Sequence, residues 1–379
     1  MTSTGSETSS LKKDPPTPQT LTASDVAELI GIPLEKLKEI AEDTASVYFP
    51  KEIRLVKGKE RPIDQPVTWF KTRLAALQRE LQKVFIPHPI VHGGVRRRSC
   101  FTAACEHLGR EVIVQRDIKD CYPSISTQMM ERELLARRVS PDVALMLARI
   151  FTVRGYIPQG SPISGVALNV FMHRFDHSIA SYAGSHGLRV TRTYDDVVIS
   201  FNNLKIANKV ARKLDREITR IGLRINEKKR KSRGLQTRNR PQYVHNLVVN
   251  SRRGVKMHPE KARQLVREAQ EYYNAAKRVT ADTAKDLVPK RRRLMGAAAN
   301  YARTYNGPAP LIRRLIEEGD RKVEAVLRRS GRLWANRRFS RIANRPDLSA
   351  YLAKILRPPE ALAPAADFTR GGSAPFDPS

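Results

Sequence analysis

Three acidic residues are the clearest candidates for chemistry in this sequence. Asp117 ends the apolar segment VIVQRDI, and Asp195 and Asp196 form an adjacent pair between the β-rich stretches LRVTRTY and VVISF. Like charges in close quarters repel and raise each other's pKa unless a cation neutralises them. Two divalent ions held by these carboxylates would do so, one activating an attacking 3′-hydroxyl and the other holding a triphosphate. Mg²⁺ prefers such oxygen ligands, so we expect two Mg²⁺ ions, with Mn²⁺ as a possible substitute.

The elements that must position these acids follow from the hydrophobic pattern. Residues 112–118 predict a strand, and residues 188–203 predict a hairpin with Tyr194-Asp195-Asp196 at its tip. The surrounding pattern predicts two short helices within 22–47, broken at Gly31-Ile32-Pro33, and a basic hairpin at 48–66 that turns at Lys57-Gly58-Lys59. It also predicts helices at 69–84, 127–151 and 204–222. A strand and then the basic run 228–233 follow, and a further strand is expected at 243–250. From about residue 257 onward the pattern is almost entirely helical and strongly basic.

The composition narrows the class of partner. Of the 379 residues, 40% are apolar, so the chain can bury a core. Its formal net charge is +31, which indicates that the protein binds a polyanion. An anionic membrane is the rival partner, but the cations are spread along the whole chain and no lipidation signal occurs. No apolar run is long enough to span a bilayer, and we expect no membrane insertion. The three cysteines form no metal-binding spacing, and without a secretion signal they indicate a reducing, cytoplasmic location.

Eight segments in order resemble motifs of the reverse transcriptases, specifically the bacterial group that includes retron and defence-associated enzymes. These segments are KERPIDQP, VHGGVRRRSC, Asp117 with Tyr122 five residues later, IPQGSPISGVALN, TYDD, GLRINEKKRK, YVHNLVVN and LMGAAANYARTYN. The resemblance covers about residues 48–320. Each match alone is weak, and the common order and spacing carry the resemblance.

The resemblance implies an α/β (α+β) fold shaped as a right hand, with fingers, a palm whose antiparallel sheet is backed by helices, and a helical thumb. The expected organisation is a disordered tail at 1–20, N-terminal helices and fingers at 21–110, the palm with a finger insertion at 111–250, the basic thumb at 251–345, and a C-terminal segment with a loose tail at 346–379. The implied activity is RNA-directed DNA polymerisation.

The resemblance also implies roles around the acids. Asp117, Asp195 and Asp196 would be catalytic and would hold metal together with Ile118. Tyr122 would lie beneath the incoming sugar and clash with a 2′-hydroxyl; a core tyrosine near a strand end is the alternative. Gln159 and Gly160 would lay a turn against the nucleotide, since glycine permits close backbone approach.

Basic residues complete the implied site. Arg61 and Lys59 on the basic hairpin would contact the triphosphate, and Lys229 would protonate or neutralise the leaving pyrophosphate; a solvated charge run is the alternative for each. The implied contacts to nucleic acid are Arg97, Tyr194, Arg291, Arg292 and Arg293. The last three are placed at the start of a thumb helix, where cations are disfavoured by the helix dipole.

The chain departs from the family pattern at several positions. Thr193 stands where these enzymes carry the tyrosine of YxDD, and Tyr194 occupies the variable position. The segments 103–107 and 244–246 differ from retron segments linked to recognition of the cognate RNA. These differences favour a related defence-associated lineage or a different RNA partner. No paired cysteines of an HNH-type endonuclease follow, which makes a group II intron enzyme the weaker choice.

The expected partners are an RNA template, in particular a dedicated structured noncoding RNA, together with dNTPs, the DNA product and a separate effector protein in antiviral defence. Two rivals stay open. A catalytically silent RNA-binding scaffold has no need of three clustered acids. An RNA-dependent RNA polymerase would carry a smaller or hydrogen-bonding residue in place of Tyr122.

Overall fold

The computed structural model describes residues 16–56, 59–251, 253–305 and 307–329. The chain divides into two compact units, the first ending at Lys256 and the second beginning at Met257. Of the tail expected at 1–20, residues 1–15 lie outside the described part, whereas residues 16–20 include a turn in which the Thr20 N–H donates to the Thr17 carbonyl at 3.1 Å. The segment expected at 346–379 also lies outside the described residues.

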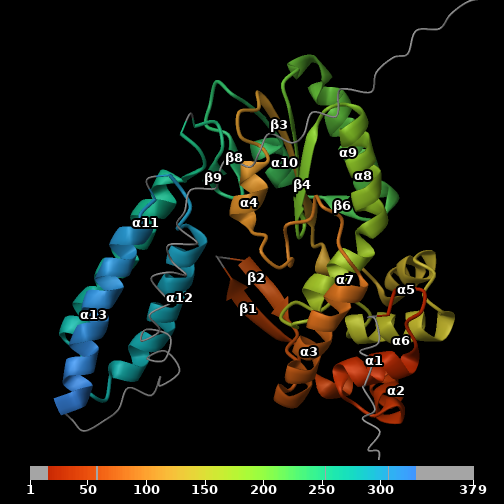
Figure 1. The fold of residues 1–379 in the computed structure, drawn as a ribbon, viewed down its shortest axis with the longest axis horizontal. Helices are drawn as coiled ribbons and strands as arrows, with labels where there is room; N and C mark the ends of the chain where they lie inside the picture. The colour runs from red at the N-terminus through yellow and green to blue at the C-terminus, as the bar shows by residue number, and fades with distance from the viewer. Residues whose placement is uncertain (1–15, 57–58, 252, 306, 330–379) are drawn as a thin grey trace, which may run out of the picture. The chain divides into compact units, whose positions relative to one another are not determined.

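A five-stranded antiparallel sheet forms the centre of the first unit (Figure 1). Its strands are β3 (Val112–Lys119), β4 (Arg189–Thr193), β5 (Asp196–Phe201), β6 (Arg224–Ile225) and β7 (Leu235–Thr237). The order is β4-β5-β3-β6, and β7 pairs with β3 as well. Both the strand expected at 112–118 and the hairpin expected at 188–203 are therefore confirmed, and β3 and β5 each have partners on both edges.

The two faces of this sheet have different neighbours. Successive side chains of a strand point to opposite faces, so Arg116 and Asp117 of β3 face opposite ways. Arg116 faces α9 (Ala207–Arg220), where its guanidinium donates to the Asp215 carboxylate at 2.5 Å. Arg192 of β4 likewise reaches Asp176 of α8 (His173–Ser185) at 2.6 Å. Helices α8 and α9 thus cover one face, and the acids lie on the other.

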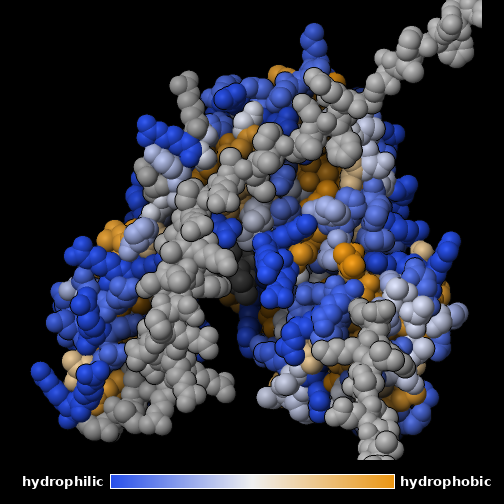
Figure 2. All heavy atoms as spheres, in the orientation of Figure 1, coloured by the Kyte–Doolittle hydropathy of each residue, from blue (hydrophilic) through white to orange (hydrophobic). Residues whose placement is uncertain are grey.

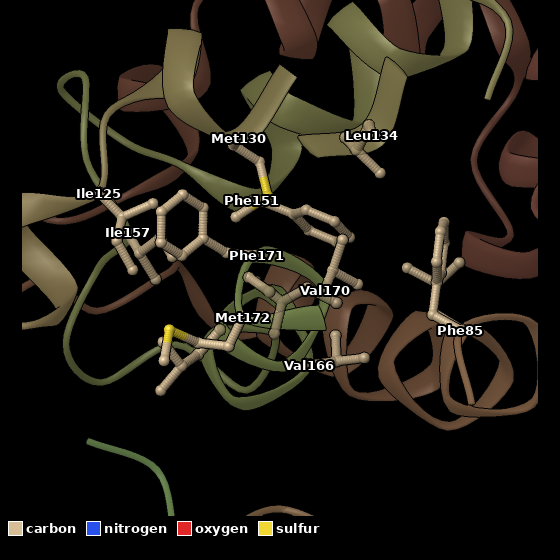
Figure 3. Packing of buried hydrophobic residues seen from close by; sticks show 14 of the residues in the cluster. Phe85, Ile125, Met130, Leu134, Phe151, Ile157, Val166, Val170, Phe171 and Met172 are labelled. Atoms are coloured by element: carbon tan, nitrogen blue, oxygen red, sulfur yellow. The ribbon is translucent and has the colours of Figure 1, made fainter. Parts of the chain in front are cut away.

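The apolar core extends from the helix-covered face into the helices of the N-terminal half. These helices are α1 (Ala23–Ile30), α2 (Leu34–Glu42), α3 (Thr68–Val84), α5 (Thr127–Ala136), α6 (Pro141–Phe151) and α7 (Ser164–Phe171). On α3 the buried residues Phe70, Leu74, Leu77, Leu81 and Val84 recur every three or four residues, as an amphipathic helix requires. Figure 3 shows Met130 of α5, Phe151 of α6 and Phe171 of α7 packed around one another.

A separate hairpin carries the basic residues expected near the triphosphate. Strands β1 (Glu52–Val56) and β2 (Lys59–Ile63) pair antiparallel, with Arg54 opposite Arg61. This confirms the expected hairpin, although residues 57 and 58 of its turn lie outside the described part of the chain.

The short helix α4 (Cys100–Cys105) lies between α3 and β3 in the chain. It is capped by Ser99, whose side chain accepts a hydrogen bond from the Thr102 N–H at 3.3 Å.

Two expectations about secondary structure are wrong in detail. The helix expected over 127–151 is two helices, because Arg138 has φ +62° and Pro141 starts the second helix at a position that needs no N–H. The strand expected at 243–250 is a hairpin of β8 (Tyr243–Val244) and β9 (Leu247–Val248), which turns at His245 and Asn246 with φ of +50° and +64°. The basic run 228–233, which the sequence pattern assigned to no element, lies on a helix, α10 (Glu227–Arg233).

The second unit is helical, as its sequence predicts. It contains α11 (Pro259–Lys277), α12 (Leu287–Asn300) and α13 (Ala309–Arg329), and the short strand β10 (Lys256–Met257) lies at the boundary between the units. The three helices pack on one another around their own core, with Tyr272, Leu294 and Ile316 fully buried. This unit is the part of the chain where the thumb is expected.

None of the described helices combines the length and apolar character needed to cross a membrane. On the face drawn in Figure 2, hydrophilic residues predominate and hydrophobic residues form small separate patches.

Candidate active site

The fold brings the three acids to one point. Asp117 lies directly opposite Asp196 in the β3–β5 pairing, and Asp195 belongs to the two-residue turn that joins β4 to β5. One carboxylate oxygen from each residue lies within 4.8 Å of the others. Among the described residues, no other group of three His, Cys, Asp or Glu side chains is arranged closely enough to hold a metal ion.

The turn that presents Asp195 depends on its neighbours. Tyr194 adopts φ +56°, a left-handed conformation that costs a non-glycine residue about 1–2 kcal/mol. The backbone of Gly93 lies directly against it: a Cβ on Gly93 would approach the Tyr194 nitrogen to 2.4 Å. The Asp195 carbonyl accepts a hydrogen bond from the Ile118 N–H at 3.0 Å. Gly93, the first glycine of the segment VHGGVRRRSC, thus allows the backbone to pass close to the tip of the β4–β5 hairpin.

Burial and mutual repulsion change the proton affinity of two of the acids. Burial, reinforced by Asp196 and Asp117, raises the pKa of Asp195 to about 6. Burial also raises the pKa of Asp117, although the Lys229 ammonium contacts this carboxylate and the Asn226 amide donates to it at 2.8 Å. A divalent cation would relieve this repulsion, and the donor set consists of oxygen atoms alone, which suits a hard ion such as Mg²⁺.

Asp196 has a different environment from the other two acids. Burial works to raise its pKa, but His245 and Lys229 outweigh this effect and the pKa is lowered. The His245 Nδ1 atom lies 3.7 Å from an Asp196 carboxylate oxygen, and the Gln115 amide donates to the other oxygen at 3.5 Å. The β8–β9 turn, which the sequence did not predict, is what brings His245 to this carboxylate.

A cleft of about 940 Å³ opens beside the acids and collects most of the expected site residues. It is lined by Arg61, Asp117, Ile118, Tyr122, Gln159, Gly160, Tyr194, Asp195 and Lys229, among others. Asp196 instead lines an adjoining cavity of about 390 Å³, together with Asp117, Lys229 and His245. The side chain of Ile118 is buried in the core, so only its backbone could reach a ligand.

Tyr122 enters the cleft from the short 3₁₀ turn Tyr122–Ser124 that follows β3. Burial raises the pKa of its phenol, with Asp195 adding to the effect, so the hydroxyl is protonated at neutral pH. The ring therefore offers the cleft a bulky neutral wall. The turn begins just after Asp120, whose φ is +45°.

The turn Pro158-Gln159-Gly160 is fixed to the base of the basic hairpin. Gly160 has φ +112°, and a Cβ there would meet the Ile63 side chain at 2.9 Å. The Gln159 carbonyl accepts a hydrogen bond from the Asp64 N–H at 2.8 Å. The Asp64 carboxylate, fully buried, binds Arg154 at 2.6 Å and accepts from the Tyr156 hydroxyl at 3.2 Å. Sequence reasoning missed Asp64 and Arg154, which lie far apart in the chain.

Another group missed from the sequence lies under the catalytic turn. Arg192 is fully buried and donates to Asp176 through Nε and Nη2, both at 2.6 Å, and to the Tyr194 carbonyl through Nη1 at 3.0 Å. Its Nη2 also donates to the Asn169 carbonyl oxygen at 3.1 Å, and the Asn169 amide donates to the Gly93 carbonyl at 3.1 Å. A buried charge that is paired and fully hydrogen-bonded can hold such a turn in place.

Several expected residues lie away from the cleft. Arg97 is exposed and lines neither of the two cavities beside the acids. The backbone of Lys59 belongs to β2, but its side chain lies outside the described part. Two histidines that were not expected in the site, His92 and His107, are buried. His107 lies between Thr191 and Ser200, hydrogen-bonded to their hydroxyls at 2.8 and 2.7 Å, and burial lowers its pKa to about 3.

The three thumb arginines differ from one another and lie within α12, which begins at Leu287, not at its start. The helix-dipole argument for them is therefore wrong. Arg291 is held by Asp320 through contacts of 2.6–2.8 Å, and Arg293 contacts Glu268. Arg292 is exposed and makes no ion pair with any described residue.

Comparison with known proteins places these features in a family. Residues 49–242 match the family described as reverse transcriptase (RNA-dependent DNA polymerase). The chain is 27% identical over 265 residues to the retron Mx65 reverse transcriptase of Myxococcus xanthus, covering 62% of this chain and 59% of that protein. It is 29% identical over 176 residues to the retron Ec86 reverse transcriptase of Escherichia coli, covering 46% of this chain and 55% of that protein. The chain thus spans between 55% and 59% of the length of these relatives.

Solved structures resemble the chain more distantly. A telomerase from Candida albicans in complex with a fragment of telomeric RNA gives a TM-score of 0.40 at 11% identity, covering 77% of this chain and 64% of that one. An apo telomerase from Candida tropicalis gives the same TM-score at 11% identity, covering 73% and 62%. Likeness at this level carries no argument about function.

Proposed function

Since the chain belongs to the reverse transcriptase (RNA-dependent DNA polymerase) family, we propose that it copies RNA into DNA at the site formed by Asp117, Asp195 and Asp196. The observation that carries the proposal is the convergence of these three carboxylates at the edge of a cleft that also holds Tyr122 and Gln159. The reaction would be nucleotidyl transfer, in which a primer hydroxyl attacks the α-phosphate of a dNTP and pyrophosphate leaves.

The three carboxylates would hold two Mg²⁺ ions, and Mn²⁺ would substitute for them. When bound, such ions lower the pKa of the attacking hydroxyl and offset charge on the phosphate oxygens. The proposal is supported by the oxygen-only donor set and by the raised pKa of Asp195, which a nearby cation would lower. Lys229, which contacts Asp117 in the described state, would turn to the pyrophosphate when metal takes its place.

The walls of the cleft would select and orient the nucleotide. Tyr122 would exclude a 2′-hydroxyl by its bulk, because its ring lines the cleft next to Asp117 and Asp195. Gln159 and Gly160 would contact the nucleotide from the turn that Asp64 fixes, and Arg61 would bind the triphosphate from β2, with Lys59 beside it. Tyr194 would contact the primer end, and Arg97 and Arg292 would contact nucleic acid elsewhere. The fingers, palm and thumb would follow the boundaries expected from the sequence.

We further propose that the template is a dedicated structured noncoding RNA and that the protein acts with a separate effector in antiviral defence. The support is the similarity to retron reverse transcriptases over about half of the chain. Sequencing the nucleic acid that copurifies with the protein tests this directly. A single RNA species with attached complementary DNA is the expected result, and a random sample of cellular RNA would contradict it.

A further inference from the structure

The outward side of α9 carries a row of cations that the polymerase reaction does not use. Lys209, Arg212, Arg216 and Arg220 are exposed and follow one another at intervals of three and four residues. This spacing places them along one line of the helix, about 16 Å long at 1.5 Å per residue. Lys205, in the 3₁₀ turn Leu204–Ile206 just before the helix, is exposed as well.

The acids of the same helix are turned away from this row. Asp215 binds Arg116 of β3 at 2.5 Å. Glu217 is buried and is shared by Lys213 and Arg220, each at 2.7 Å, and by the Ser178 hydroxyl at 3.0 Å. Lys209, Arg212 and Arg216 make no ion pair with any described residue. These three residues of the row therefore carry positive charge that no described carboxylate neutralises, whereas the charge of Arg220 is shared with Glu217.

On the exposed side of another helix, α2, the cations are instead paired with acids. On α2, Lys36 pairs with Glu39 at 2.6 Å and Lys38 pairs with Glu35 at 2.8 Å. Such i,i+3 pairs stabilise a helix, whereas like charges at the same spacing destabilise it. The cations in the row on α9 repel one another, and a bound polyanion would offset that repulsion.

The row lies on the opposite side of the sheet from the acids. Arg116, which points away from the Asp117 face, reaches α9 through Asp215, so α9 covers the far face of the sheet. Its cations point outward again, away from Val210, Leu214 and Ile218, which are buried against that face. The segment of nucleic acid that lies in the cleft beside Asp117 therefore cannot also lie on the row, which would bind a different segment.

We propose that this row, the α9 surface, binds the phosphate backbone of a double-stranded segment of RNA outside the cleft. The proposal rests on the proposed function, because the RNA would be part of the template molecule. The exposed residues of α9 include no aromatic ring on which unpaired bases could stack, as single-strand platforms require. They include no apolar residue that could enter a membrane. Duplex RNA is recognised by its shape and backbone, which suits a row of cations.

The test uses the full chain with three substitutions, Lys209→Gln, Arg212→Gln and Arg216→Gln. The probe is a blunt RNA hairpin with a stem of about 16 base pairs, and the cleft is saturated with an RNA–DNA primer–template and the next dNTP. The variant should bind the hairpin roughly tenfold or more weakly and lower the slope of log K against log salt by about 2 to 3. Primer extension should be unchanged, because the three residues are remote from the cleft.

The matched control removes the same number of charges at Lys36, Lys38 and Lys83, whose side chains are exposed and paired with glutamates. Hairpin binding by Lys36→Gln, Lys38→Gln, Lys83→Gln should stay close to that of the unaltered chain. Equal loss in both variants would show a general effect of net charge and overturn the proposal. So would loss of binding to anionic vesicles or to single-stranded RNA, with the hairpin unaffected. If the unaltered chain extends no primer, the proposed function fails, while hairpin binding still reports on the α9 surface.

Discussion

Among the three acids, Asp195 is the one whose proton affinity differs most from that of a free carboxyl. Burial and the charges of Asp196 and Asp117 act in the same direction and raise its pKa to about 6. His245 and Lys229 oppose burial at Asp196 and lower its pKa. One β-hairpin therefore presents two adjacent carboxylates of unequal basicity. This inequality makes Asp195 the residue through which pH should act on the site.

The first prediction concerns the stability of the metal-free protein. The folded pKa of Asp195 lies above the ordinary value of 3.8, so the folded state holds an extra proton between about pH 4 and pH 6. Stability therefore falls as pH rises through this window. Asp195→Asn removes the buried charge and should raise the melting temperature above pH 6, with the gain vanishing below about pH 4. A thermal melt series without metal measures it, and an Asn variant less stable at pH 7 would contradict the account.

The second prediction concerns the sugar. Tyr122→Ala should raise the ratio of rNTP to dNTP incorporation on one RNA template by roughly tenfold or more, because it removes the ring that would clash with a 2′-hydroxyl. Tyr122→Phe keeps the ring and should keep the preference for dNTPs. A wild-type enzyme that already prefers rNTPs would favour the RNA polymerase alternative.

At the scale of elements, the β4–β5 turn is held by parts of the chain that are distant in sequence. Arg192 connects the turn to α8 through Asp176 and to Gly93 through Asn169. The hydrophobic pattern predicted the strands and the acidic tip, because alternation and turn residues are local signals. It could not show that Arg192 is buried, since an arginine in a strand reads as exposed. The β8–β9 turn was missed for a related reason: left-handed residues other than glycine leave little trace in a sequence.

The third prediction tests Arg192 as a positioning residue. Lysine keeps the charge but cannot form the paired contacts with Asp176 and the contact with the Tyr194 carbonyl. Arg192→Lys should lower kcat about tenfold or more, raise the Mg²⁺ concentration needed for half-maximal rate, and leave the KM for dNTP nearly unchanged. Loss of a partner in a buried ion pair also costs about 3–5 kcal/mol, so Arg192→Ala is expected to unfold. A lysine variant with reduced stability but full kcat and metal affinity would show a purely structural role.

At the scale of the whole molecule, the net charge of +31 is distributed among residues with different tasks. The sequence correctly identified a basic helical second unit, but it could not distinguish cations held within that unit from cations facing solvent. Arg291 is bound to Asp320, whereas Arg292, the next residue, is exposed. The pairing partners lie on another helix, and composition carries no information about them. The sequence of α9 likewise could not show that its acids bind residues of other elements and leave a row of cations on the outward side.

The fourth prediction separates these arginines. Arg292→Ala should weaken RNA binding and lower the slope of log K against log salt by roughly 0.7–0.9, with little change in melting temperature. Arg291→Ala should instead destabilise the second unit by about 2 kcal/mol, because it removes the cationic partner of the Asp320 carboxylate and leaves it with the Tyr272 hydroxyl. Salt-dependent binding and thermal melts of the two variants provide the comparison. An unchanged salt slope for Arg292→Ala would show that nucleic acid does not contact this side of α12.

The central claim is that the three carboxylates form a metal-dependent centre that copies RNA into DNA. The most direct measurement is single-nucleotide primer extension on an RNA template with Mg²⁺, comparing the unaltered chain with Asp195→Asn and Asp196→Asn. Each substitution removes one metal ligand and should lower the rate at least about a thousandfold, since a loss of several kcal/mol is expected, while the variants still fold and bind RNA. Addition of a dNTP by the unaltered chain, lost in both variants and on removal of Mg²⁺, is the predicted result. Full extension by the double variant would contradict the account.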